Sequence, residues 1–137
     1  MRYVVAGTLL LFSTLAMAGN NAGFEMGGNY ARFDPVVGQY NQSGELFRIE
    51  GHCQSSCTLF LGIRNACVDR NATLLFHSAH DNNRNVSPSL TTHMLGAYNA
   101  GLRDYVIAHH YMDTLEFHAI SGRDIIRKFG YRECPKK

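Results

Sequence analysis

Apolar and polar side chains recur along this chain with two different periods, and each period predicts a different element. In residues 45–51, ELFRIEG, Phe47 and Ile49 alternate with neighbours that face the other way, which is typical of a strand. Residues 55–63, SSCTLFLGI, space their apolar side chains as one face of a compact helix does. Residues 66–79, ACVDRNATLLFHSA, have the pattern of two strands joined by a turn.

Three further segments carry start and stop signals of helices, namely a polar or proline residue at the start and a glycine at the end. The predicted boundaries are Asp34-Pro35 to Ser43-Gly44, Ser89 to about His110, and Ser121 to Gly130. Strands that alternate with helices in this way predict an α/β fold.

The start of the chain has the three parts of a secretory signal peptide. Arg2 supplies a positive charge, Val4–Leu15 is mostly apolar, and Ala-Met-Ala at 16–18 fits the small residues of a cleavage site. The apolar run is too short to span a membrane comfortably. We therefore expect residues 1–18 to be a cleaved leader and residues 19–137 to be a single exported domain, periplasmic or secreted.

Charge narrows the choice of partners. The chain has 13 Lys and Arg and 11 Asp and Glu, which gives a formal net charge of +2. Proteins that bind nucleic acid usually carry a basic face, and this balance does not require one. We therefore expect no nucleic-acid partner.

Cys53, Cys57, Cys67 and Cys134 form an even set, which predicts disulfide bonds in an exported chain. A structural zinc site would need a second close pair, and the last two cysteines are far apart in sequence. Four cysteines allow three pairings, and the sequence does not choose among them. We expect at least one bond from Cys53 or Cys57 to Cys67, because these lie on consecutive elements, with Cys134 taking the remaining partner.

The stretch GHCQSSCTLF places Ser55 and Ser56 where a short turn after Gly51 enters the predicted helix. The simplest interpretation is that a serine caps the helix. A helix N-terminus also stabilises negative charge, so the same position suits a nucleophile, with the amide of Ser56 facing the developing oxyanion. His77 ends the strand TLLFH. Consecutive parallel strands end at the same edge of a sheet, which predicts that His77 lies beside Ser55 as its base.

These residues, in this order, resemble the ClpP-type serine peptidases of the ClpP/crotonase superfamily. The segment from Gly51 to Ser55 matches the family's G-x-x-x-S turn, and VDRNATLLFH resembles the strand that ends in the family's histidine, here His77. EMGG resembles the family's glycine turn, which implies that the amide of Gly28 belongs to the oxyanion hole. With the late helix SGRDIIRKFGY, the likeness covers about residues 24–134 and implies a small superhelix of strand–strand–helix units. The Cys-x-Ser-x-Cys-Thr motif together with a signal peptide resembles exported bacterial ClpP-like proteins.

The chain departs from the family pattern at the third catalytic residue. The family has an aspartate four residues before the late serine, and here that position is Phe117. Asp113 and Glu116 are the nearby acids in sequence that could take this role, and we assign Asp113 as the substitute. Two interpretations follow. The protein is a serine hydrolase that acts on peptide bonds or a related acyl group, or it is a catalytically degenerate binding protein on the same fold, which Phe117 favours.

No cofactor is expected. An exported protein has no ATP beside it, so we expect no ATPase partner, and peptides, envelope proteins or further copies of the chain remain open as partners. Histidine is the residue that could suggest a metal, but the histidines lack the spacing of a known metal site. The seven are His52, His77, His80, His93, His109, His110 and His118. We therefore predict no metal site.

Overall fold

The computed structural model describes residues 19–137, so the predicted leader, residues 1–18, lies outside the described residues. The described chain is a mixed α/β structure with two three-stranded sheets. The strands are β1 (Gly19–Asn20), β2 (Phe47–Ile49), β3 (His52–Gln54), β4 (Ala66–Val68), β5 (Thr73–Phe76) and β6 (His118–Ser121). The helices are α1 (Tyr30–Ser43), the 3₁₀ helix η1 (Ser55–Gly62), α2 (Pro88–Gly96), α3 (Ala100–Ala108) and α4 (Gly122–Phe129).

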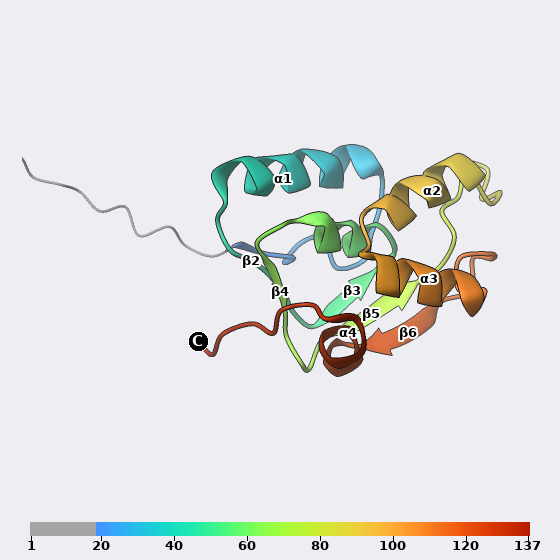
Figure 1. Ribbon diagram of the computed structural model, residues 1–137. Helices are drawn as coiled ribbons and strands as arrows, with labels where there is room; N and C mark the ends of the chain where they lie inside the picture. The colour runs from blue at the N-terminus through green and yellow to red at the C-terminus, as the bar shows by residue number, and fades with distance from the viewer. Residues whose placement is uncertain (1–18) are drawn as a thin grey trace, which may run out of the picture.

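The chain visits the two sheets alternately. The first sheet has the order β1-β2-β4 with parallel pairs, and the second has the order β3-β5-β6, with β6 antiparallel to β5. From β2 the chain passes to β3 and forms η1, and it then repeats the passage with β4, β5 and α2. Figure 1 shows β2 beside β4 and β3 beside β5. The repeat therefore brings the ends of β3 and β5 to one edge.

The core lies between the sheets and the helices, and α4 adds Ile125 to it while lying next to α3 and β6 (Figure 1). Phe33 of α1, Phe47 of β2 and Phe60 of η1 are all at most 2% exposed. The ring of Phe60 lies 5.4 Å from that of Phe33 and 4.6 Å from that of Phe47, measured between centroids. These aromatic contacts fix η1, the helix that opens with Ser55, against both α1 and the first sheet.

The predicted start of α1 at Asp34 is wrong, although its end at Ser43-Gly44 is confirmed. The helix begins five residues before Pro35, and Asn29 caps it by accepting a hydrogen bond from the amide of Ala31 at 2.8 Å. Pro35 therefore lies inside the helix rather than at its first position. Gly44 ends the helix with a left-handed backbone, φ +72°.

The single long helix predicted from Ser89 to about His110 is also wrong, because the segment forms two helices. Ser87, not Ser89, caps α2, which ends at Gly96. Asn99 then caps α3 by accepting a hydrogen bond from the amide of Leu102, and its side-chain nitrogen donates to the carbonyl of Phe129 at 2.7 Å. The chain breaks because Asn99 makes these contacts, which a continuous helix would not allow.

Other boundaries agree with the sequence. Ser121 caps α4 by accepting from the amide of Asp124 at 3.1 Å, and Gly130 ends it at φ +74°. β2, β4 and β5 lie where the apolar patterns placed them. The expected short turn after Gly51 is instead the strand β3, and β6 was not expected.

The disulfide pairing differs from the expected one. Cys53 bonds to Cys57 and Cys67 bonds to Cys134, so no bond joins Cys53 or Cys57 to Cys67. Because β3 continues directly into η1, the first pair lies on one turn of chain, with Cα atoms 5.2 Å apart. Cys67 instead lies on β4 in the first sheet, where the C-terminal tail runs alongside. Two disulfides are compatible with an oxidising, exported location.

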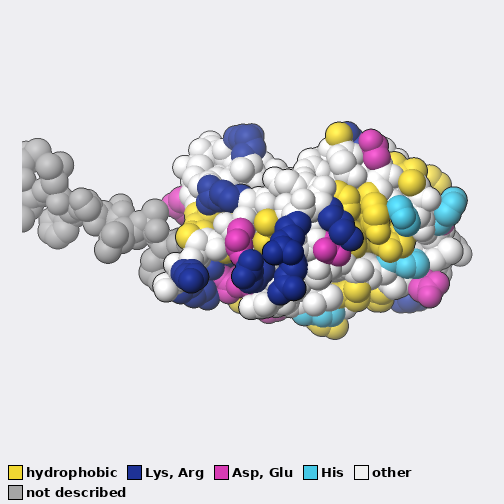
Figure 2. All heavy atoms as spheres, turned by 60° about the horizontal axis from the view of Figure 1, so that its bottom comes forward, with side chains coloured by type: hydrophobic (Ala, Val, Ile, Leu, Met, Phe, Trp, Pro, Cys, Tyr) yellow, Lys and Arg dark blue, Asp and Glu magenta, His cyan; other side chains and the backbone are white. Residues whose placement is uncertain are grey.

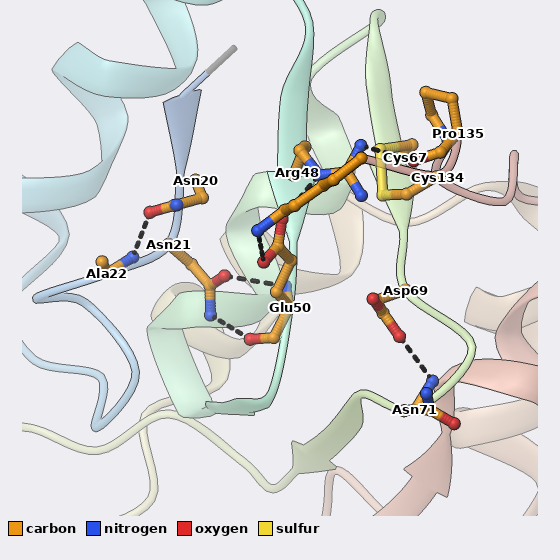
Figure 3. Close-up of polar contacts among 11 residues, drawn as sticks. Asn20, Asn21, Ala22, Arg48, Glu50, Cys67, Asp69, Asn71, Cys134 and Pro135 are labelled. Carbon is orange, nitrogen blue, oxygen red and sulfur yellow. Dashed lines mark hydrogen bonds and ion pairs between the residues drawn. A yellow bond between two sulfur atoms is a disulfide. The ribbon is translucent and has the colours of Figure 1, made fainter.

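A network of paired polar groups holds the C-terminal tail against the first sheet (Figure 3). Arg48 is 8% exposed, and its guanidinium donates to the carboxylate of Glu50 and, at 2.9 Å, to the carbonyl of Pro135. Lys137 donates to the other carboxylate oxygen of Glu50 at 3.0 Å. The Cys67–Cys134 disulfide closes the same region. We call Asn21, Arg48, Glu50, Pro135 and this disulfide the tail network.

Asn21 joins β1 to this network through a buried side chain, 2% exposed. Its amide nitrogen donates to the carbonyls of Glu50 at 3.0 Å and His52 at 3.1 Å, and its oxygen accepts from the amide of Glu50 at 2.8 Å. A buried amide costs stability unless it is hydrogen-bonded, and here both ends are.

Charges of both signs share the surface. On the face that Figure 2 shows, Lys and Arg side chains lie among Asp and Glu side chains, and hydrophobic and histidine side chains gather beside them. Arg70 pairs with Glu133 at 2.8 Å, next to the tail network. Among residues 19–137, no helix has the length and apolar character needed to cross a membrane.

Candidate active site

The structure brings the side chains of Ser55 and His77 together. Ser55 directly follows β3 and His77 directly follows β5, and the parallel register sets Gln54 opposite Leu75. The Oγ of Ser55 and the Nε2 of His77 are 2.7 Å apart, a hydrogen-bonding distance. His77 is only 5% exposed. This is the contact that a nucleophilic serine needs with its base.

Ser55 has an unusual backbone. Its φ is +55°, a left-handed conformation that residues with a side chain seldom adopt. Thr58 donates to the carbonyl of Ser55 at 2.7 Å, and the hydroxyls of Thr58 and Tyr98 are 2.6 Å apart. Both supporting side chains are buried. Such strain costs about 1–3 kcal/mol and persists where surrounding contacts impose it, often at functional sites.

Neither serine caps η1, so the simplest interpretation of this stretch is wrong. The N-cap residue is Gln54, and no side chain accepts a hydrogen bond from the first turn. The hydroxyl of Ser55 lies against His77 instead, and that of Ser56 donates to the carbonyl of Gly28 at 2.6 Å. The first amides of a helix have no partner within it. The amide of Ser56 therefore remains available beside Ser55.

The turn Gly27-Gly28 packs directly on the two serines. A Cβ atom at Gly27 would lie 2.9 Å from the Cβ of Ser55 and 3.0 Å from the carbonyl oxygen of Gln54, closer than real side chains approach. Gly27 also has a φ of +74°. The amide of Gly28 donates no backbone hydrogen bond. The structure thus brings Gly28 and Ser56 together. Gly27 also belongs to the site, and the only sequence signal for it was that two glycines stand side by side.

Asp113 is not brought to the imidazole of His77. Its carboxylate pairs with the Nδ1 of His110 at 2.7 Å, in an exposed position. Glu116 is exposed as well, and its only described hydrogen bond is from its own amide to Thr114. The Nδ1 of His77 is buried and has no hydrogen-bond partner among the described residues. Within residues 19–137, no acid therefore orients this histidine.

The side chain that packs beside His77 is Phe117 and not an acid. β5 and β6 pair Phe76 with His118, so the same register, continued by one residue, sets His77 opposite Phe117. The two rings are 4.4 Å apart between centroids, with planes inclined by 38°. The segment is held in place by Ser78, whose amide and hydroxyl both donate to the carbonyl of Thr114, at 2.9 and 2.8 Å.

The surroundings of His77 favour its neutral form. Burial lowers the pKa of His77 from its ordinary value of 6.5, and this is the largest effect. The backbone of Leu115 acts in the opposite direction and raises this pKa, although it does not complete a hydrogen bond to Nδ1. Positive charge at His80 and Arg84 lowers the pKa further. A neutral imidazole is the form that accepts a proton from serine.

An apolar hollow of about 380 Å³ lies beside the segment that carries His77. Thr91 lines the hollow and accepts a hydrogen bond from the amide of Ala79 at 2.9 Å, two residues after His77. Met112 lines it from the segment that leads to Phe117. The volume falls within the range of about 300–1,000 Å³ typical of small-ligand sites. Within residues 19–137, no three His, Cys, Asp or Glu side chains gather as metal ligands would.

No family model matches this chain, and no curated protein is detectably similar to it in sequence. The geometry of Ser55, His77 and the residues packed around them is therefore what indicates a function.

Proposed function

We propose that this protein is a serine hydrolase that uses a Ser55–His77 dyad on a peptide bond or a related acyl group. The observation that carries the proposal is the 2.7 Å contact between the Oγ of Ser55 and the Nε2 of His77. The left-handed backbone of Ser55 supports it, because strain of this kind is maintained where function requires it. The uncapped start of η1 supports it as well.

In this mechanism Ser55 attacks the carbonyl carbon of the substrate while His77 takes the hydroxyl proton at Nε2. The amides of Gly28 and Ser56 donate to the oxyanion that forms. His77 then returns the proton to the leaving group, and a water molecule releases the acyl group from Ser55 by the same steps in reverse order. The apolar hollow next to the His77 segment offers a place for an apolar part of the substrate.

We also propose that the fold belongs to the ClpP/crotonase superfamily. The support is the repeated passage from first sheet to second sheet to helix, which makes two strand–strand–helix units. The two disulfides support export to the periplasm or beyond. An exported hydrolase of this kind would act without an ATPase partner, on peptides or envelope proteins.

A second candidate function is a catalytically degenerate binding protein on the same fold. Phe117 favours it, because an aromatic ring fills the position where a carboxylate would orient His77. In a Ser-His-Asp triad the acid holds the correct tautomer, and its loss lowers the rate by about 10⁴-fold. In that case the apolar hollow beside the His77 segment would bind part of a peptide or an envelope protein, without cleavage.

The two functions are separated by a fluorophosphonate probe, which reacts with activated serines and needs no knowledge of the substrate. We expect the wild type to be labelled, Ser55→Ala to be inert, and His77→Ala to react more slowly by orders of magnitude. Ser56→Ala is the matched control, because its proposed role uses the backbone amide. A folded wild type that stays unlabelled would favour the binding protein. If Ser56→Ala is the variant that loses labelling, the nucleophile is Ser56 and not Ser55.

A further inference from the structure

The buried nitrogen of His77 is the polar atom in the described chain that most needs an explanation. Nδ1 has no hydrogen-bond partner there, and leaving a buried polar atom unpaired costs about 1–3 kcal/mol. A catalytic imidazole must nevertheless be held in one orientation, or its Nε2 would swing away from Ser55. The backbone of Leu115 acts on this histidine without completing a hydrogen bond, so packing against the ring has to contribute to its orientation.

We propose that Phe117 is the positioning residue of the dyad and that it keeps His77 a working base at acidic pH. This deepens the proposed hydrolase function and rests on it. The ring of Phe117 packs on the imidazole at 4.4 Å and restricts its rotation from one face. It also keeps water from a histidine that is 5% exposed. A carboxylate would orient the ring too, but it would favour the protonated imidazole, which cannot accept a proton.

The position of Phe117 is set by the fold and not by its own hydrophobicity. The register of β5 and β6 fixes residue 117 opposite His77, and the two hydrogen bonds from Ser78 to Thr114 hold the segment there. Phe117 is 43% exposed, so burial in the core does not fix its ring. The contact that its ring makes is with the imidazole of His77.

The charged groups that face His77 agree with operation at acidic pH. His80 and Arg84, both on the segment that follows β5, bring positive charge toward the ring. From the opposite segment, 112–117, the groups nearest the ring are the Leu115 backbone and the Phe117 ring, while Asp113 pairs with His110. Ser55, at the start of η1, is neutral. With no carboxylate facing it, the imidazole stays unprotonated to lower pH than an ordinary histidine.

The test compares Phe117→Ala and Phe117→Asp with the wild type in two measurements. The first is the pH dependence of fluorophosphonate labelling. The second is an NMR titration of the His77 ring, assigned with His77→Gln, which needs no activity. Leu90→Ala is the control, because Leu90 is a similarly exposed apolar residue, 37% against 43%, on α2.

We expect the midpoint of the acid limb to rise from the wild type to Phe117→Ala and again to Phe117→Asp, with the NMR midpoints of His77 in the same order. Above these midpoints, Phe117→Ala should react roughly 10- to 100-fold more slowly, because its imidazole is less well oriented. Phe117→Asp should recover much of that loss, since its carboxylate can accept from Nδ1. Leu90→Ala should match the wild type in both measurements.

The possible failures are distinguishable. If the wild type is labelled but Phe117→Ala keeps the same acid limb, NMR midpoint and rate, Phe117 does not position His77 and the inference is wrong. If no variant is labelled but the His77 titration follows residue 117 as expected, the hydrolase function fails, while Phe117 still sets the state of the ring. If neither labelling nor a dependence on residue 117 is seen, both fail.

Discussion

The tail network and the Ser55–His77 site both contain buried polar groups, but they differ in whether these groups are hydrogen-bonded. In the tail network, the amide of Asn21 and the guanidinium of Arg48 find hydrogen-bond partners on neighbouring segments (Figure 3). At the site, Nδ1 of His77 is unpaired, Ser55 has a left-handed backbone, and no side chain caps η1. The two regions lie on adjacent sheets of one small fold.

This difference indicates which region serves stability and which serves chemistry. Buried polar groups in folded proteins are almost always satisfied, so an exception calls for a reason. The contacts of the tail network tie the C-terminal tail and β1 to the first sheet, and this is a structural role. The unsatisfied and strained features of the second region gather around the Ser55–His77 contact, which is typical of a functional site. Variants of each region test this division.

The largest expected loss of stability comes from the disulfide of the tail network. Replacing Cys67 and Cys134 by alanine opens a loop of 67 residues in sequence separation, which the chain-entropy relation values at about 4 kcal/mol. Replacing Cys53 and Cys57 opens a separation of only 4 and should cost about 2 kcal/mol. Urea unfolding of the two double variants measures both. Equal losses, or a larger loss for the Cys53–Cys57 variant, would show that the Cys67–Cys134 disulfide is not the main covalent source of stability.

Asn21→Ala should cost about 2–3 kcal/mol in the free energy of unfolding. The substitution leaves the amide of Glu50 and two backbone carbonyls without their partner in a buried position. Asn20→Ala is the matched control, because Asn20 is exposed and its side chain bonds only the nearby amide of Ala22. The control should stay within about 0.5 kcal/mol of the wild type. If both variants unfold alike, the hydrogen bonds of Asn21 contribute little.

At position 55, a glycine variant should be more stable than an alanine variant, which is the reverse of the usual order. Alanine is normally the more stabilising choice, but at φ +55° glycine is unstrained and alanine is not. We expect Ser55→Gly to be about 1 kcal/mol more stable than Ser55→Ala, while neither reacts with the probe. Thermal unfolding of the pair provides the comparison. An alanine variant at least as stable as the glycine variant would show that residue 55 is not strained.

The smallest expected effect is on the pH dependence of stability. The pKa of His77 is lowered in the native state, so below about pH 6.5 the unfolded chain binds a proton that the native protein does not. This histidine therefore destabilises the fold as the pH falls from 6.5 toward its native pKa, and it has no such effect at higher pH. His77→Gln should lose less stability than the wild type between pH 7.5 and 5. Identical losses would mean that His77 titrates normally.

Much of this arrangement could be predicted from the sequence, because local patterns determine it. The alternation around Phe47 and the apolar run before His77 identified the strands β2 and β5, although these two lie in different sheets. Ser55 follows β3, which was predicted as a turn and which pairs in parallel with β5, and parallel strands end at one edge. The contact of Ser55 with His77 follows from that rule. The cap and stop of α4 followed from Ser121 and Gly130, whose preferences are local.

The features that the sequence did not reveal depend on contacts between distant segments. The disulfide partners depend on which sheet each strand joins, and the cysteine spacing carries no such information. The break before Asn99 depends on its hydrogen bond to Phe129, 30 residues later. The contact of Phe117 with His77 depends on β6, a strand whose sequence gave no clear alternation.

The central claim is that the fold, and not the serine itself, makes Ser55 a nucleophile. The most direct test is the intact mass of wild-type protein after incubation with the fluorophosphonate probe, in native buffer and in denaturing urea, followed by peptide mapping. We predict one adduct per chain in native buffer, located on Ser55, and none in urea. A native protein that remains unmodified, or one modified equally in urea, would contradict the claim.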